Sequence, residues 1–354
     1  MVEIKLSSFR ISSFTIFAAF LALNFAFYVI GLLSGKTVFN FANEANTDGT
    51  AYYTIALAPF KEPPVDSGFR YSTFLYPLLV WLVAAGNTFA TAVTMEVINI
   101  ITFSLSVTIF YKIAKTESFP IATIFYAFNP ILLISMHGGM NEPLYYMLMF
   151  AGLLLFRKDK FLPASLVLSL AVIARPDFFV FALPYFALAK GKKFLPYLSI
   201  ILITIAGFGY YLVSRFTLQH FIEFARGSDL PPQLGIPFAT FLHNRFFGAT
   251  GTFQIRGTNL ILNEIVVWTI FLAIILSIYF AVRKKHVDMF SLCLIVLGST
   301  IQPAYSYFSG YFRFISLAPS LYKIPSLLLK GKTLKLLAAS YAVFGFALLT
   351  IWFF

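Results

Sequence analysis

Long, unbroken runs of apolar residues recur along this chain of 354 residues. Residues 13–33 are the clearest example, with no charged side chain in 21 positions. A membrane-spanning helix needs about 20 mostly apolar residues, so such runs are typical of helices that cross a lipid bilayer. Charged residues make up only 11% of the chain, whereas a soluble domain has about 25%. A water-soluble surface cannot be built from so few charges, and the sequence therefore predicts an integral membrane protein.

The same pattern separates this chain from other classes of protein. An outer-membrane β-barrel would show segments of about ten residues with alternating polarity, whereas the apolar runs here are continuous. Disordered chains have low hydrophobicity, and hydrophobic residues make up 59% of this one. Cys293 is the single cysteine, so no intramolecular disulfide can form. The spanning segments are therefore expected to be helices.

About eleven runs are long enough, or nearly long enough, to span a bilayer, with ten and twelve as the limits of the count. They are residues 13–33, 89–111, 119–136, 142–156, 161–174, 177–189, 195–214, 262–282, 288–303, 312–329 and 334–353. The segment 72–86 is apolar but short and contains Pro77, so we expect an interfacial or re-entrant helix there. The predicted fold class is a single all-α membrane domain over residues 1–354.

The positions of the basic residues orient these helices, because Lys and Arg collect in cytoplasmic loops. With the N-terminus inside and 72–86 not crossing, 16 of the 26 Lys and Arg lie in inner segments. Nine lie outside, and Lys323 lies in the inner half of a span, where its ammonium can snorkel to the surface. Counting 72–86 as a span would turn every later basic cluster outward. We therefore expect a multi-pass protein of the cell membrane, or of the endoplasmic reticulum membrane in a eukaryote, with a cytoplasmic N-terminus.

The net charge of +12 is then mostly a topology signal. Nucleic-acid binding needs a basic face with stacking aromatic residues, and the basic clusters here contain two or three residues each, so no nucleic-acid partner is expected. Anionic membrane lipids are the expected partners of these clusters. The loops are short except for two on the outer side, residues 34–88 and 215–261. Function in a compact membrane protein is expected on such long, sided loops.

The first outer loop carries a carboxylate at the start of a predicted short amphipathic helix. Asp48-Gly49 is a turn signal, and Tyr52 follows in the helical segment. A carboxylate at the outer mouth of a helical bundle suits a general base. The alternative is that Asp48 is an N-cap residue on a solvated loop.

Further ionisable residues lie at the outer ends of predicted spans. Glu142 opens one span, and Arg313 lies at the outer start of the tenth. Arg175 and Asp177 interrupt apolar sequence between two others, and Glu96 lies about two turns into the second span. Ionisable side chains at such positions are costly and are functional candidates by default. The alternative is structural pairing at the interface, of Arg175 with Asp177 and of Arg313 with Glu142.

The second outer loop contains arginine but no lysine, at positions Arg215, Arg226, Arg245 and Arg256. A guanidinium binds phosphate through a fork of donors, so this loop is a candidate to hold a lipid phosphate. The alternative is ordinary contact with lipid headgroups. The four histidines are scattered, which argues against a His-based metal site. A divalent ion held by Asp48 and Glu142 is the weaker alternative.

In this order, these residues resemble the GT-C superfamily of polytopic glycosyltransferases, which use polyprenyl-phosphate sugars, and within it the GPI mannosyltransferase II-like group. The resemblance covers about residues 10–325 and rests on the order and common sidedness of five short motifs. They are Asp48-Gly49-Thr50-Ala51-Tyr52, Tyr76-Pro77, Asn141-Glu142-Pro143-Leu144, Ala174-Arg175-Pro176, and Arg313-Phe314 with Ala318-Pro319. Two positions depart from the pattern: Thr47 stands where a Trp is often found, and Asn46 precludes an Asp-x-Asp pair.

The resemblance implies an inverting glycosyltransferase. It would move a sugar, expected to be mannose, from a polyprenyl- or dolichyl-phosphate donor to a hydroxyl of a lipid-linked or glycan acceptor on the extracytoplasmic face. Asp48 and Glu142 are the expected catalytic residues, and no metal cofactor is required. The donor phosphate is expected to be bound by Arg175, Arg313, Arg245 and Arg256. Substrate contacts are expected from Tyr52, Tyr76, His137, Asn141 and Asp177.

Two other functions are alternatives: a multi-pass transporter or lipid flippase, and a non-catalytic subunit of a transferase complex. A transporter is expected to have repeat symmetry, broken helices within the membrane and charges near its midplane. A subunit would tolerate replacement of Asp48 without loss of activity. The enzyme interpretation also allows for a small partner subunit.

Overall fold

The computed structural model describes residues 12–34, 48–61, 73–175, 182–215, 289–298 and 316–353, with a few single positions between 272 and 282. Every regular element within these ranges is helical, which confirms the predicted all-α class for this part of the chain. The second outer loop, residues 215–261, lies outside the described residues except at its first position, and the predicted span 262–282 is described only at those single positions.

The helices follow the apolar runs closely. They are α1 Ser13–Leu33, α2 Asp48–Leu57, α4 Leu75–Ala84, α5 Thr88–Thr116, α6 Ala122–Ala127, α7 Pro130–His137, α8 Glu142–Arg157, α9 Phe161–Ala174, α11 Leu183–Ala189, the 3-10 turn η3 Gly191–Lys193, α12 Leu195–Arg215, α16 Met289–Gly298, α18 Pro319–Leu328 and α19 Gly331–Phe353. Two of them, α1 and α9, coincide with the predicted runs 13–33 and 161–174.

Three of the described helices are long and apolar enough to cross a membrane: Ser13–Leu33, Thr88–Thr116 and Gly331–Thr350. Others are shorter than the usual span, such as α8 with 16 residues and α9 with 14, where about 17–25 are typical. Membrane-capable helices are therefore present, and the count of eleven spans stays a prediction.

Three predicted spans are wrong as continuous helices: 119–136; 177–189, where α11 begins only at Leu183; and 312–329, where α18 begins only at Pro319. Residues 119–136 form two helices, α6 and α7, separated at Phe128 and Asn129. Pro130 explains the break, because proline lacks an N–H and disfavours helical geometry in the residue before it. The Asn129 side chain then accepts a hydrogen bond from the Ile131 N–H at 3.0 Å and caps the start of α7.

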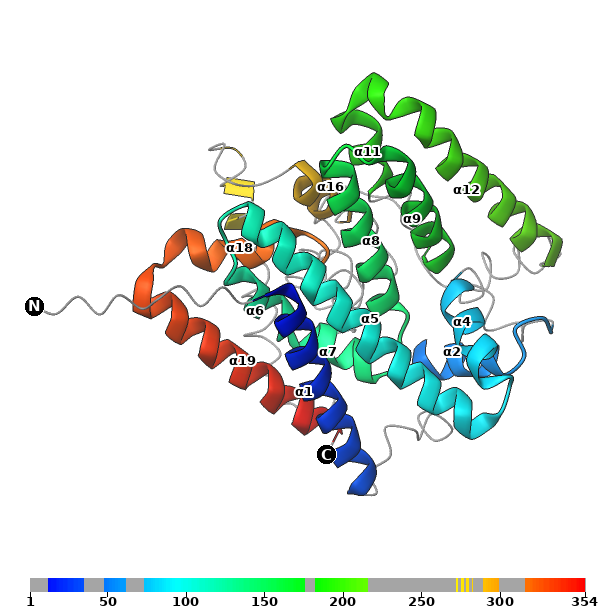
Figure 1. Cartoon of the computed structure of the whole chain (residues 1–354), viewed down its shortest axis with the longest axis horizontal. Coiled ribbons are helices and arrows are strands. Elements are labelled where there is room, and N and C mark those ends of the chain that lie inside the picture. The colour runs from blue at the N-terminus through cyan, green and yellow to red at the C-terminus, as the bar shows by residue number, and fades with distance from the viewer. Residues whose placement is uncertain are drawn as a thin grey trace, which may run out of the picture.

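The longest helix, α5, runs through the middle of the bundle (Figure 1). It packs against α8 on one side, and α9 and α12 follow outward from α8, while α1 packs on its other side. The α8–α9 contact is close because Gly152 lies against Leu168, where an added Cβ would overlap the leucine side chain. Small residues at helix contacts are typical of membrane bundles, since close approach increases van der Waals packing.

The short helix α4 turns back into α5. It has ten residues and ends at Ala85 and Gly86, both with positive φ, before α5 begins at Thr88. A Cβ on Gly86 would lie 2.8 Å from the Leu57 carbonyl oxygen, so α2 also approaches this turn closely. A helix of ten residues is about 15 Å long and too short to cross a bilayer, in keeping with the expectation for 72–86.

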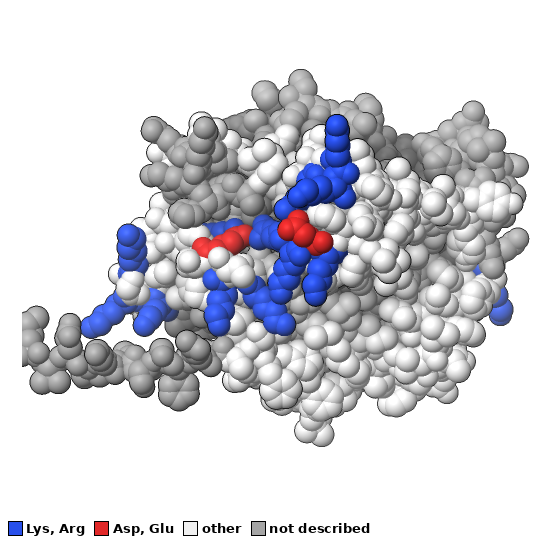
Figure 2. Space-filling model, turned by 45° about the horizontal axis from the view of Figure 1, so that its top comes forward, with Lys and Arg blue, Asp and Glu red and all other residues white. Residues whose placement is uncertain are grey.

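Charged side chains gather at the end of the bundle where α5 and α8 finish. Glu117, just after α5, forms ion pairs with Arg157 at the end of α8 and with Lys323 of α18. Asp159 in the next turn pairs with Lys190 at 3.1 Å. Figure 2 shows Lys and Arg side chains forming a band around acidic side chains on this face.

Lys323 does not snorkel to the surface as expected. Its side chain is 1% exposed, and its ammonium instead pairs with the Glu117 carboxylate. A carboxylate at the end of a neighbouring helix thus replaces solvent as the partner of this buried cation.

Candidate functional site

The connection between α7 and α8 carries the polar residues at the opposite end of the bundle. His137 is the last residue of α7 and Glu142 the first of α8, and both are buried, at 0% and 1% exposure. Only Gly138, Gly139, Met140 and Asn141 separate them. Each of the two ionisable side chains reaches a different neighbouring helix, so this short connection joins α5 to the end of α9.

Glu142 forms an ion pair with Arg175, the residue that follows α9. The guanidinium Nη1 donates to the Glu142 Oε1 at 2.6 Å, and the Arg175 side chain is only 12% exposed. The same guanidinium lies over the Tyr145 ring, 5.7 Å from its centroid. The Asn141 amide donates to the Ala174 carbonyl at 3.0 Å, which ties the start of α8 to the end of α9. Glu142 and Arg175 are thus held together from both sides.

This pairing differs from the one expected for two structural ion pairs. That alternative joined Arg175 to Asp177 and Arg313 to Glu142, whereas the structure joins Arg175 to Glu142. Asp177 and Arg313 lie outside the described residues.

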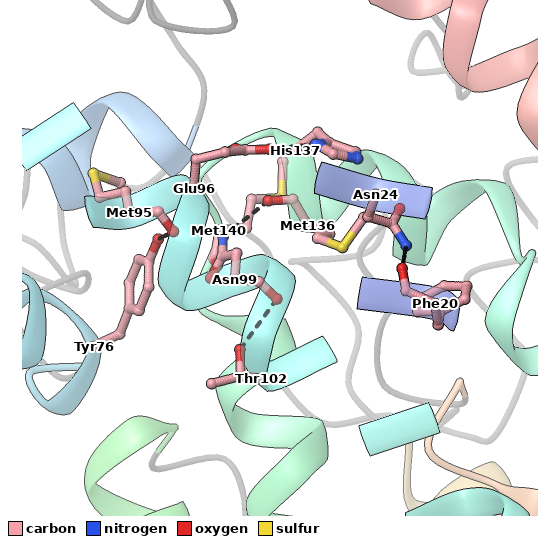
Figure 3. Close-up of polar contacts among 10 residues, drawn as sticks. All are labelled: Phe20, Asn24, Tyr76, Met95, Glu96, Asn99, Thr102, Met136, His137 and Met140. Atoms are coloured by element: carbon pink, nitrogen blue, oxygen red, sulfur yellow. Dashed lines mark hydrogen bonds and ion pairs between the residues drawn. The ribbon is translucent and has the colours of Figure 1, made fainter. Parts of the chain in front are cut away.

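Glu96 and His137 form a second buried acid–base contact. The His137 Nδ1 lies against the Glu96 Oε1, and both side chains are fully buried. Figure 3 shows the two side chains pointing toward one another across the gap between α5 and α7. One turn further along α5, the Asn99 amide donates to the carbonyls of Met136 at 3.0 Å and Met140 at 2.9 Å.

Tyr76 connects these residues to α2 and to the position of Asp48. Its hydroxyl donates to the Met95 carbonyl at 3.3 Å, next to Glu96, and its ring stacks edge-on with Tyr52 at 5.9 Å. Burial raises the pKa of the Tyr76 phenol well above its usual range, and the nearby Glu96 carboxylate adds to this effect. Asp48 is the first residue of α2, one turn before Tyr52, and its side chain lies outside what the structure describes.

Several acceptor atoms in this region have no hydrogen-bond donor among the described residues. They are Glu96 Oε2, Asn99 Oδ1 and Asn141 Oδ1, and all three side chains are at most 1% exposed. A buried acceptor without a donor is costly, so such atoms favour a bound water or a ligand that presents hydroxyl groups.

Six predicted site residues with described side chains come together at this end of the bundle: Tyr52, Tyr76, His137, Asn141, Glu142 and Arg175. Asp177, Arg245, Arg256 and Arg313 lie outside the described residues. Glu96 is a functional candidate by its position in a predicted span, whereas Asn99 was not predicted. Their spacing of three residues, which puts both on one face of an apolar helix, is the signal that was available.

Metal ligands do not cluster here. The part of the chain that the structure describes contains no group of three or more His, Cys, Asp or Glu side chains that could hold a metal ion. In comparisons with other proteins, no protein-family model, curated protein or solved structure matches this chain.

Proposed function

We propose that this chain is an integral-membrane inverting glycosyltransferase that uses a polyprenyl-phosphate sugar, with mannose as the expected sugar. The observation that carries the proposal is the buried Glu142–Arg175 pair, since both residues belong to the motifs that resemble the GT-C superfamily. The contact between Tyr76 and Tyr52, which lies one turn after Asp48, supports a role for the start of α2 in the same site. The meeting of residues from motifs far apart in the sequence supports the proposal.

In the proposed reaction, Asp48 acts as general base. Its carboxylate takes the proton of an acceptor hydroxyl, and the hydroxyl oxygen attacks the anomeric carbon of the donor sugar. As that carbon–oxygen bond forms, the bond from the anomeric carbon to the phosphate oxygen on the opposite face breaks. The electron pair leaves with the polyprenyl phosphate, and the configuration of the sugar is inverted.

Arg175 would stabilise the leaving phosphate. A guanidinium has five N–H donors in a fixed fork, so it can bind a phosphate oxygen while it also binds Glu142. The low dielectric of a buried site strengthens this attraction. Glu142 keeps the cation in place before the donor arrives, and the buried acceptors on Asn141 and Asn99 suit the hydroxyl groups of a sugar. A metal ion is not needed for such a leaving group, and Glu142 already has Arg175 as its cation.

The proposal includes an orientation in the membrane. Arg157, Lys190 and Lys323 lie at the end of the bundle opposite Glu142, within a band of Lys and Arg side chains, which supports placing that end in the cytoplasm and the site outside. The acceptor, lipid-linked or glycan, would then approach from the extracytoplasmic face, with or without a small partner subunit.

The test uses the whole protein in lipid nanodiscs with radiolabelled dolichyl-phosphate mannose and a lipid and glycan extract as acceptor. We expect transfer by the wild type and a loss of roughly 10²–10⁴-fold in Asp48→Asn. Asp159→Asn is the matched control, because it removes a carboxylate that is 61% exposed at the other end and should leave transfer unchanged. Chelator should leave the wild type active. An Asp48→Asn protein as active as the wild type would rule out this residue as the base and favour a non-catalytic subunit.

A substrate carrier is the second candidate, and the break between α6 and α7 favours it. Discontinuous helices line the binding sites of many transporters. At this break, however, Asn129 caps α7 and its amide also donates to the Tyr322 hydroxyl at 3.2 Å, so protein groups satisfy the interruption. Uptake of labelled polyprenyl-phosphate sugar into proteoliposomes, without transfer to any acceptor, would establish the carrier instead.

A further inference from the structure

We propose that Glu96 and Asn99 of α5 are positioning residues: through His137 and two backbone carbonyls they hold the His137–Glu142 connection, and so place Glu142 against Arg175. The inference about catalysis rests on the proposed function. The inference that these residues hold the connection in place does not, and it can be tested without any substrate.

Asn99 holds both sides of the connection at once. Its amide donates to the Met136 carbonyl in the last turn of α7 and to the Met140 carbonyl, two residues before Glu142. The final carbonyls of a helix have no partner within the helix, and a buried carbonyl without a donor is costly. One side chain therefore supplies donors that the end of α7 needs and fixes how far the chain advances before α8 begins.

Glu96 contacts the same connection at His137, the last residue of α7. Its carboxylate contacts the His137 ring, and the Phe27 ring of α1 lies 5.0 Å from that ring on another side. Neither Glu96 nor His137 is exposed to solvent, so their contact offsets part of the free-energy cost of burying both groups. Replacing Glu96 by a residue without an acceptor would leave the imidazole buried without this contact.

The backbone of the connection is rich in glycine. It contains Gly138 and Gly139, the latter with φ of 67°, and glycine gives the backbone more freedom than any other residue. Backbone hydrogen bonds from the Gly138 N–H to the Ile134 carbonyl at 2.7 Å and from the Met140 N–H to the Ser135 carbonyl at 3.2 Å tie it to α7. The contacts to Glu96 and Asn99 are what relate it to α5, and the Asn141 bond relates it to α9.

The first measurement is hydrogen exchange of the backbone amides of residues 137–142, followed by mass spectrometry in nanodiscs. Losing a buried hydrogen-bond partner should raise exchange roughly tenfold or more in Glu96→Ala and in Asn99→Asp, whose carboxylate cannot donate to carbonyls. Glu96→Gln keeps an acceptor oxygen for His137 and should stay within about twofold of the wild type. Ser106→Ala is the matched control, since it removes the buried α5 contact to Tyr126 at 2.9 Å elsewhere in the helix.

The second measurement is the effect on transfer. We expect kcat to fall at least about tenfold in Glu96→Ala and Asn99→Asp with a smaller change in KM for the donor, and Glu96→Gln to restore most of the rate. Unchanged exchange in both variants would overturn the inference that these residues hold the connection in place. Raised exchange with wild-type kcat would overturn the positioning role. A wild type that transfers no sugar would instead count against the proposed function and would leave the exchange result standing as its own test.

Discussion

The two ends of α5 and α8 hold charged residues in contrasting ways. At the start of these helices, Glu96 and Glu142 are fully buried, and each faces one basic side chain from another element, His137 or Arg175. At their other end, about 30 Å away along α5, Glu117 is 23% exposed and shared between two cations, and exposed lysines surround it.

The first arrangement is typical of a functional site, and the second is typical of a surface that meets water and lipid headgroups. Ionisable groups paired one to one in an apolar interior cost desolvation free energy and are kept where the geometry of those groups is needed. Charges in excess at a helix end, exposed to headgroups and water, cost little and act through their number and sign. We therefore propose the first end as the place for chemistry and the second as the one that orients the chain.

The largest effect on stability and transfer is expected at the start of α5 and α8, where each buried carboxylate faces one basic side chain. Arg175→Met leaves the Glu142 carboxylate, 1% exposed, without its guanidinium, and breaking a buried ion pair typically costs about 3–5 kcal/mol. We expect a lower thermal unfolding temperature in nanodiscs and loss of transfer. The double variant Glu142→Gln with Arg175→Met should recover stability but not transfer, because no buried charge is left unpaired. Recovery of both would mean that the pair is structural.

A smaller loss is expected at Glu117. Glu117→Ala removes the partner of Lys323, which is 1% exposed, and of Arg157, which is 24% exposed. Because this end is partly solvated, the free energy of unfolding should fall by less than the roughly 3–5 kcal/mol of a fully buried pair. Adding Lys323→Met to this variant should restore most of the lost free energy of unfolding. Transfer measured at a temperature where the variant stays folded should equal that of the wild type.

The contrast between the ends also explains how far the sequence predicts this molecule. Helix bounds such as 13–33 and 161–174 follow from the hydropathy alone, because a lipid environment forces apolar runs into helices. The break at Asn129-Pro130 also follows from the sequence, because a proline disfavours helical geometry in the residue before it. The pairing of ionisable side chains is harder to predict from the sequence. The ion pair between Glu142 and Arg175 joins residues 33 positions apart, and the pattern of charges does not indicate which helix ends meet.

Asn99 shows most clearly what cannot be predicted from the sequence. An asparagine within an apolar helix signals a polar contact, but its partners here are the carbonyls of Met136 and Met140, and carbonyls are present at every residue. Only the fold identifies them. Candidate residues can thus be found by type and position, while the contacts that fix their geometry cannot.

A much smaller effect is expected for an exposed ion pair at the basic end. Asp159 and Lys190 are 61% and 36% exposed, and pairs of this kind contribute about 0–1 kcal/mol. Asp159→Asn should shift the unfolding temperature far less than Glu117→Ala, and 1 M salt should remove the difference by screening. A shift as large as that of Glu117→Ala would mean that this whole end is as tightly coupled as the site.

The smallest effect on folding is expected from the exposed lysines. Lys192 and Lys193 in η3 point to solvent, and replacing both with Gln should change the free energy of unfolding by no more than about 0.5 kcal/mol in zwitterionic nanodiscs. In nanodiscs rich in anionic lipid the wild type should gain stability, and the variant should gain less, because each lysine near the surface contributes about 1 kcal/mol of attraction. The readout is the difference in unfolding temperature between the two lipid compositions. An equal gain in both proteins would show that these lysines do not face the headgroups, and would remove the basic end as the feature that orients the chain.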